Sequence, residues 1–118
     1  MKVLLILNDT PYGTDRSYNG LRLARTLSGS GSQSLELRLF LMGQAVLCGI
    51  ARQRPPEGCY KPEEMLEELT GQGVQIGACG TCMDERDIPQ ERMVEGVRRS
   101  SMEELAQWSL WADKVLVF

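Results

Sequence analysis

Cys79 and Cys82 are separated by Gly80 and Thr81, and they follow directly on the short apolar run of residues 74–78. A Cys-x-x-Cys pair just past the end of a β-strand places two sulfur atoms within reach of each other at a backbone turn. The chemistry there can be redox, metal binding or sulfur transfer. The chain contains no histidine. Catalysis by a Ser-His or Cys-His pair and metal binding through histidine are therefore excluded, and any reaction must use thiols, carboxylates and backbone dipoles.

The surroundings of the first cysteine favour a thiolate, which is the nucleophilic form of a thiol. The backbone N–H groups of residues 80–82 can point at the sulfur of Cys79, and Gly80 lets the chain turn tightly there. Arg86, four residues beyond Cys82, can add a positive charge. Such a thiolate can attack the sulfur of a persulfide or a disulfide, with Cys82 placed to resolve or to shield the product. Two adjacent but unreactive thiols are the alternative.

A structural zinc site would need all four cysteines of the chain, which are Cys48, Cys59, Cys79 and Cys82. Ten residues separate Cys48 from Cys59, whereas common zinc sites use separations of about two to four residues. Cys48 lies in an apolar run and is interpreted as a small core residue. Cys59 is expected to lie in an exposed loop. We therefore predict no bound metal and no other cofactor.

The loop of residues 8–14 follows the first predicted strand and precedes a helix, which is where phosphate groups bind in doubly wound folds. It contains a single glycine and an acidic residue, and it matches no phosphate-binding fingerprint. We interpret it as an ordinary turn between a strand and a helix. Its carboxylate, Asp9, could still approach the cysteine pair.

Apolar runs predict the strands that position these residues. The first run is continuously apolar and is interpreted as a central strand, and the last is interpreted as a buried strand. The second alternates in its pattern and is interpreted as half-buried and near a sheet edge. The fourth is interpreted as a short strand or an irregular crossing. The predicted strands are residues 3–7, 35–41, 74–78, 93–97 and 114–118.

Helices are predicted between these strands. The first begins near residue 14 or 15 and presents an apolar face at spacings of three residues, consisting of Tyr18, Leu21, Ala24 and Leu27. A short helix is predicted over 42–50, and another begins at Pro62, which suits a first helical turn. Residues 84–90 are predicted to be a loop. The last helix begins with a capping-box pattern at Ser101 and Glu104 and is expected to bury Met102, Leu105 and Trp108.

This alternation predicts a single α/β domain over residues 1–118, a three-layer sandwich with a mainly parallel five-stranded sheet. Ligands bind at the carboxyl ends of the strands in such sheets, so the loop of residues 8–14 and the cysteine pair are predicted to share one face. The 13 basic and 16 acidic residues give a net charge of −3. This charge argues against direct binding of nucleic acid or of an anionic membrane.

No apolar stretch is long enough to span a bilayer. The apolar run at the N-terminus ends at Asn8, so it is predicted to be a strand and not a signal peptide. Four cysteines without a secretory signal are typical of reactive thiols in a reducing cytosol. We therefore expect a cytoplasmic protein.

The chain resembles the DsrE/DsrF-like family of small sulfur-relay proteins, and within it the YchN-type branch. The segments that carry the resemblance are residues 8–13, 37–42, 79–84, 104–108 and 112–116. The resemblance implies a flavodoxin-like α/β fold and assembly into homotrimers or homohexamers. It also implies a cysteine that carries persulfide sulfur at the position of Cys79. In relay members this cysteine accepts sulfur from one partner protein and passes it to the next.

The leading hypothesis is a cytosolic homo-oligomer in which Cys79 accepts sulfur as a nucleophile and Cys82 is the resolving or auxiliary thiol. Arg86 and the N–H groups that follow Cys79 would stabilise the thiolate. One alternative is a dithiol redox module that cycles through a disulfide between Cys79 and Cys82. Another is an oligomeric binding protein whose cysteines are incidental. The sulfur donor and acceptor would be other proteins, and no membrane partner is expected.

Overall fold

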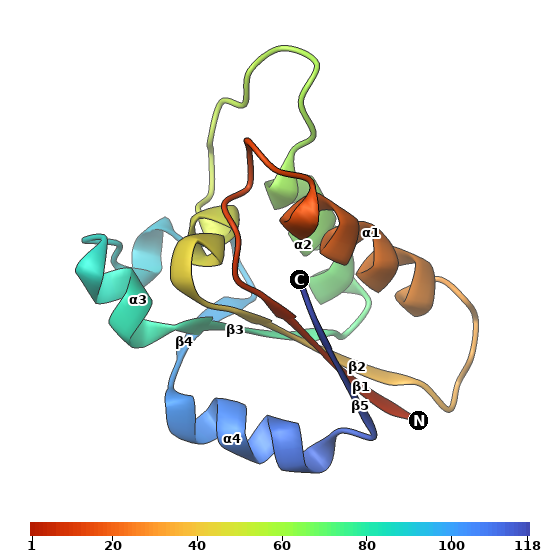
Figure 1. Ribbon diagram of the computed structural model, residues 1–118. Coiled ribbons are helices and arrows are strands. Elements are labelled where there is room, and N and C mark those ends of the chain that lie inside the picture. The colour runs from red at the N-terminus through yellow and green to blue at the C-terminus, as the bar shows by residue number, and fades with distance from the viewer.

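The computed structural model describes residues 1–118 as a parallel β-sheet with helices on both faces (Figure 1). All four strand pairs are parallel, which confirms the predicted α/β sandwich. The five strands lie in the order β4-β3-β2-β1-β5 and are β1 (Lys2–Leu7), β2 (Glu36–Leu41), β3 (Gln75–Cys79), β4 (Val97–Ser100) and β5 (Lys114–Val117).

The longer helices form the outer layers of the sandwich. Helices α1 (Arg16–Ser28) and α2 (Pro62–Gly71) pack against each other on one face of the sheet, and α4 (Met102–Trp111) covers the other face (Figure 1). Helix α2 begins at Pro62 as predicted and buries Met65, Leu66 and Leu69. None of the helices combines the length and the apolar composition that a bilayer-spanning segment requires.

Three short helices lie at the carboxyl ends of the strands or lead back into the sheet. A 3₁₀ helix, η1 (Gly43–Gly49), follows β2 where a short helix was predicted. Helix α3 (Gly80–Glu85) follows β3 without an intervening loop, and the 3₁₀ turn η2 (Gln90–Arg92) leads towards β4. The prediction of a loop over residues 84–90 is therefore wrong at both ends, because residues 84 and 85 belong to α3 and residue 90 begins η2. The six residues of α3 are too few for a helical apolar period to appear in the sequence.

The prediction that the second strand lies near a sheet edge is wrong, because β2 is the central strand. Its alternating residues suggested one solvent-facing side, but that side is covered by α4. Phe40 is fully buried and meets Trp108 edge to face, with ring centroids 6.1 Å apart. The guanidinium of Arg38 lies 3.9 Å from the ring centroid of Trp111. A charged residue therefore fits on the covered face because its planar head stacks on an aromatic ring.

The prediction that the last strand is buried is also wrong, because β5 is an edge strand that pairs only with β1. Val115 is 42% exposed and Val117 is 63% exposed. In register, Val117 lies beside Ile6, and Ile6 lies beside Phe40, so these side chains share the face that α4 covers. Helix α4 lies over Phe40 and leaves the two valines exposed. An apolar run in a sequence does not reveal whether a helix of the same chain reaches it.

The fourth strand begins four residues later than predicted, at Val97, and Met93 forms only an isolated bridge with Ile50. The last helix buries Leu105 as predicted, whereas Met102 is 56% exposed. Its predicted start is confirmed at Ser101, the N-cap residue.

The predicted capping box forms only in part. The hydroxyl of Ser101 accepts the backbone N–H of Glu104 at 3.2 Å. The Glu104 carboxylate, however, binds the Ser100 hydroxyl at 2.5 Å and the Arg98 guanidinium at 2.7 Å. It does not return to the backbone of Ser101, because a cation from β4 competes for it.

Candidate functional site

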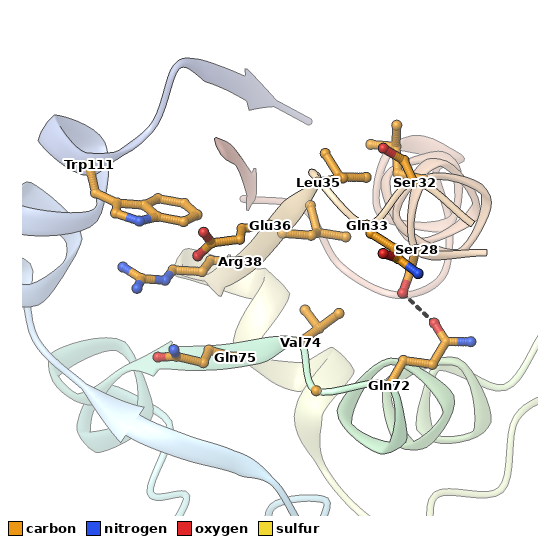
Figure 2. A pocket seen from close by; sticks show the side chains of 13 residues that line it. Ser28, Ser32, Gln33, Leu35, Glu36, Arg38, Gln72, Val74, Gln75 and Trp111 are labelled. Carbon is orange, nitrogen blue, oxygen red and sulfur yellow. Dashed lines mark hydrogen bonds between the residues drawn. The ribbon is translucent and has the colours of Figure 1, made fainter. Parts of the chain in front are cut away.

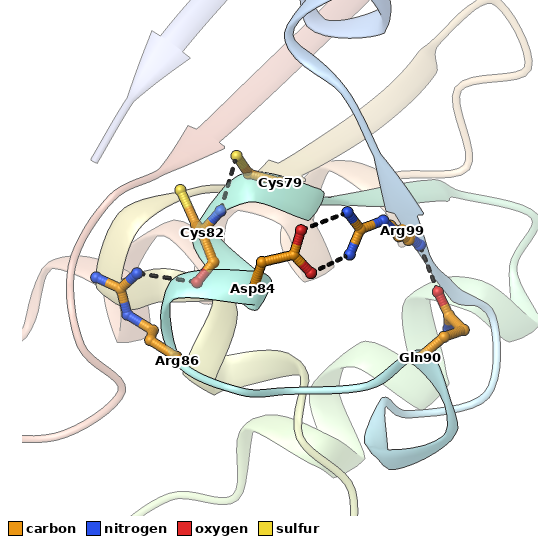
Figure 3. Close-up of polar contacts among 6 residues, drawn as sticks. All are labelled: Cys79, Cys82, Asp84, Arg86, Gln90 and Arg99. Atoms are coloured by element: carbon orange, nitrogen blue, oxygen red, sulfur yellow. Dashed lines mark hydrogen bonds and ion pairs between the residues drawn. The ribbon is translucent and has the colours of Figure 1, made fainter.

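The cysteine pair lies where β3 ends and α3 begins. Cys79 is the final residue of β3 and the N-cap of α3. The backbone N–H of Cys82 donates to the sulfur of Cys79, with N and Sγ 3.5 Å apart (Figure 3). The spacing of three residues closes the first helical turn, which returns Cys82 to Cys79. Both thiols are free.

A second backbone donor reaches the pair from the segment that follows the neighbouring strand β2. The N–H of Gly43 donates to the sulfur of Cys82 at 3.2 Å. Gly43 is the first residue of η1, two residues after the end of β2, and has a φ of 57°, a left-handed conformation that favours glycine. The sequence interpretation did not include Gly43. A glycine just after an apolar strand, at the sheet edge where the cysteines lie, was the signal available in the sequence.

The two thiols differ in accessibility and in their surroundings. Cys79 is only 6% exposed, whereas Cys82 is half-buried. Burial raises the pKa of the Cys82 thiol, and a hydrogen bond with the sulfur of Cys79 raises it further. The N–H of Gly43 and the charge of Arg86 oppose this increase. Cys82 is therefore a neutral thiol near pH 7 and can donate its proton to the sulfur of Cys79.

Arg86 lies beside Cys82. Its Nη1 donates to the carbonyl oxygen of Cys82 at 3.0 Å, and its Nε donates to the side-chain oxygen of Gln44 at 2.8 Å. Both contacts hold the guanidinium on the Cys82 side of α3 (Figure 3). Arg86, the cation predicted from the sequence, therefore lies near the cysteine pair, beside Cys82 and not beside Cys79.

Arg99 is a second arginine at this site, and the sequence interpretation missed it. It extends from β4 to the opposite side of α3 from Arg86 (Figure 3). Its two Nη atoms donate to the two carboxylate oxygens of Asp84 at 2.7 and 2.8 Å. A Cβ atom added at Gly80 would lie 2.8 Å from the Cζ of Arg99. The missing side chain of Gly80 therefore makes room for the guanidinium next to Cys79.

The other two residues predicted to support the site lie differently. Thr81 is exposed on α3. Asp9 makes no hydrogen bond to either cysteine, since its carboxylate accepts the hydroxyl of Thr14 at 2.7 Å and the N–H of Thr10 at 2.9 Å. Both bonds, that from Thr14 more strongly, lower the pKa of Asp9. Asp9 therefore closes the turn between β1 and α1, in agreement with the interpretation of this loop as an ordinary turn.

The remaining cysteines do not join the pair. Cys48 is fully buried in η1, and Cys59 is exposed in the loop before α2. No three cysteine or carboxylate side chains lie close enough together to hold a metal ion. The four sulfur atoms therefore form no zinc site in this arrangement.

A separate cavity of about 310 Å³ lies at the amino ends of β2 and β3, the opposite end of the strands from the cysteines (Figure 2). Arg38, Gln75 and Trp111 line one part of it, and Ser28 and Gln72 close another part through a hydrogen bond. None of the four cysteines lines it.

Comparison with known proteins supports the resemblance drawn from the motifs. Residues 1–118 match the DsrE/DsrF-like family. Protein YchN of Escherichia coli K12 is 46% identical over 117 residues, which cover 99% of this chain and 98% of YchN. An uncharacterized protein of Methanopyrus kandleri is 33% identical over 116 residues, which cover 98% of this chain and 93% of that protein. The crystal structure of E. coli YchN matches with a TM-score of 0.93, over 100% of this chain and 99% of that chain.

Proposed function

This chain belongs to the DsrE/DsrF-like family, and on that premise we propose that it is a small cytosolic sulfur carrier. Cys79 takes up persulfide sulfur, and Cys82 is the resolving thiol. One observation carries the proposal. The sulfur of Cys79 receives the backbone N–H of Cys82 at the carboxyl end of β3, with the free thiol of Cys82 beside it. This edge of a parallel sheet is where ligands bind in open α/β folds.

In the loading step, the thiolate of Cys79 attacks the outer sulfur of a donor persulfide, R–S–SH. The S–S bond of the donor breaks, a Cys79–S–SH persulfide forms, and the donor leaves as the thiolate R–S⁻. An acceptor thiolate can then attack the outer sulfur and regenerate the Cys79 thiolate. The N–H of Cys82 stabilises the negative charge on the sulfur of Cys79 before loading and after transfer. No cofactor is needed for either step.

Cys82 controls the lifetime of the persulfide on Cys79. Its thiolate can attack the inner sulfur of the Cys79 persulfide, which forms a disulfide between Cys79 and Cys82 and releases HS⁻. The raised pKa of Cys82 keeps most of this thiol protonated near neutral pH and slows that attack. The arrangement therefore favours transfer to an acceptor over spontaneous loss of sulfide.

The adjacency of the two thiols also favours a second candidate, a dithiol redox protein. In this reaction the thiolate of one cysteine attacks a substrate disulfide, and the other thiolate resolves the mixed disulfide. The substrate disulfide is reduced to two thiols, and a disulfide between Cys79 and Cys82 is formed. No sulfur atom is gained by the protein in this case.

Intact-mass spectrometry after exposure to a small persulfide, with peptide mapping, distinguishes these reactions. The proposal predicts the gain of one reducible sulfur on Cys79, its loss in Cys79→Ser, and a longer-lived adduct in Cys82→Ser. Cys59→Ser is the matched control, since Cys59 is exposed and distant in sequence from the pair. Loss of two hydrogens without a gain of sulfur would support the redox candidate. No change at either cysteine would contradict both and leave a non-catalytic binding protein.

We also propose assembly into a homo-oligomer, a trimer or a hexamer. Exposed apolar residues on β5 and on the outer side of α4 support this, because Leu110 is 89% exposed and Val117 is 63% exposed. Sedimentation velocity tests it. We expect a trimer or hexamer that Val117→Asp dissociates, and a monomeric native chain would refute it. The sulfur donor and acceptor would be further protein partners.

A further inference from the structure

Arg99 takes part in neither the loading of sulfur onto Cys79 nor its transfer to an acceptor, yet it lies close to that cysteine. Its guanidinium lies against the backbone of Gly80, the residue after Cys79, and a Cβ there would lie 2.8–2.9 Å from three guanidinium atoms. The side chain of Arg99 is nonetheless 47% exposed. Solvent therefore reaches this cation, although it lies against the residue that follows Cys79.

Both ends of Arg99 are held in place. Its backbone N–H donates to the side-chain oxygen of Gln90 at 2.5 Å (Figure 3). The Gln90 amide in turn donates to the carbonyl oxygen of Val97 at 2.8 Å. At the far end, Asp84 binds the guanidinium through two parallel hydrogen bonds. A cation fixed in this way loses little conformational freedom when it binds a ligand.

Asp84 and Arg99 shift each other's pKa. The hydrogen bond from Arg99 lowers the pKa of Asp84. Hydrogen bonding to Asp84 raises the pKa of Arg99, and the charge of Cys79 adds a smaller increase. Arg99 is therefore close enough to Cys79 for their charges to interact, whereas Arg86 acts on Cys82.

The ion pair also shows what the guanidinium can bind. Asp84 is a carboxylate that sits on it in a bidentate geometry, which is the arrangement that arginine offers to carboxylates in general. Arg99 keeps its Nε–H and one hydrogen on each Nη free of Asp84. Asp84 is 64% exposed, so its own contribution to stability is small and its place can be shared with a second carboxylate.

We propose that Arg99 recognises the carboxylate of a small persulfide donor that reacts at Cys79, and that Asp84 both orients the guanidinium and competes with that carboxylate. The identity of the donor as a persulfide rests on the proposed function. The preference of the site for an anionic reagent does not. Loading proceeds as written above, with the thiolate of Cys79 attacking the outer sulfur and the donor leaving as a carboxylate-bearing thiolate.

The matched reagents iodoacetate and iodoacetamide test this preference. They differ by one negative charge, and both alkylate the same thiolate with release of iodide, so the ratio of their rates at Cys79 does not depend on thiol ionisation. The rates are measured near neutral pH and low salt, by peptide mapping in a Cys82→Ser background. We expect Arg99→Gln to lower the ratio by about three- to tenfold, the effect of one nearby surface charge. Arg99→Lys should restore part of it.

Asp84→Asn should change the ratio in the opposite direction, because it removes the competing carboxylate and leaves the arginine. A purely structural ion pair predicts the same change for both variants. Arg54→Gln is the control for net charge, since Arg54 is exposed in the loop before α2. If Arg99→Gln does not fold, the inference is tested by Asp84→Asn alone, in which the iodoacetate to iodoacetamide ratio at Cys79 should rise.

An unchanged ratio in Arg99→Gln, a fall in both variants, or a native Cys79 that neither reagent alkylates would overturn the inference. Persulfide loading is a separate measurement. A protein that shows the predicted ratios without taking up sulfur would refute the proposed function and retain the anionic preference. A protein that takes up sulfur, but whose iodoacetate to iodoacetamide ratio does not change in Arg99→Gln, would support the proposed function and refute the role of Arg99.

Discussion

The guanidinium of Arg99 lies in the space where residue 80 would place its side chain if that residue were not Gly80. The contact joins two neighbouring strands of the sheet, because Arg99 belongs to β4 and Gly80 begins the helix after β3. In the parallel register, Arg99 is the partner of Ala78. One missing methyl group thus controls how close a cation comes to Cys79.

Gly80→Ala should displace Arg99 and lower the iodoacetate to iodoacetamide ratio at Cys79. Its effect on stability should be small, because Gly80 has no left-handed φ and alanine in a helix is favoured over glycine by about 0.5–1 kcal/mol. Gly71→Ala is the control, since nothing lies within 4 Å of a Cβ at that position of α2. Alkylation and urea unfolding of both variants measure this. An unchanged ratio in Gly80→Ala would show that the contact does not matter to Cys79.

Cys48 and Cys59 should differ sharply in reactivity. Burial raises the pKa of Cys48 to about 12, so this thiol is protonated at pH 8 and shielded from reagents. Cys59 is exposed. Iodoacetamide followed by peptide mapping of the native protein should modify Cys59 and leave Cys48 intact until denaturant is added. Modification of both at similar rates in the native state would contradict the burial of Cys48.

Glu104 should make the protein sensitive to acid. Its hydrogen bond to Arg98, and to a lesser degree that from Ser100, lowers the pKa of Glu104 below its ordinary value of 4.5. This stabilisation is complete above the unfolded-state pKa and is lost as the pH falls through the folded-state pKa. Glu104→Gln should therefore lower the free energy of unfolding by about 1 kcal/mol at pH 7.

Urea unfolding at pH 7 and at pH 3 measures this, and the difference between Glu104→Gln and the native chain should shrink at the lower pH. Glu103→Gln is the control, because Glu103 is exposed in the same first turn of α4 and forms no ion pair. An equal loss of stability in both variants would assign the effect to the charge of the helix end.

Gly20→Ala should destabilise the fold. A Cβ at Gly20 would lie 2.4 Å from a methyl group of Leu7, which is fully buried, and 3.2 Å from the ring of Phe118. Overpacking costs about 1–3 kcal/mol, and the helix preference of alanine offsets less than about 1 kcal/mol of it. Gly71→Ala should leave the free energy of unfolding unchanged or raise it, because nothing lies within 4 Å of a Cβ at that position. Equal unfolding free energies for the two variants would show that the side chains of Leu7 and Phe118 can move aside without loss of stability.

Local features of the chain were sufficient to predict the fold class and the position of the cysteine pair. Apolar runs and helical spacing depend on neighbouring residues, and the three-residue step from Cys79 to Cys82 closes a single turn in any helix. Strand order was not predictable in this way. The pattern of β2 resembled an edge strand because the sequence does not show that Trp108 and Trp111 cover its polar side.

By itself, then, the sequence determined an α/β fold with two thiols at a strand end, because these depend on short-range periodicity. Only the tertiary structure decided which groups surround the thiols. Gly43 reaches Cys82 across 39 residues of sequence, and Arg99 reaches Asp84 across 15. Both contacts exist because β2, β3 and β4 lie side by side in parallel register, so that segments following or ending these strands meet at one edge.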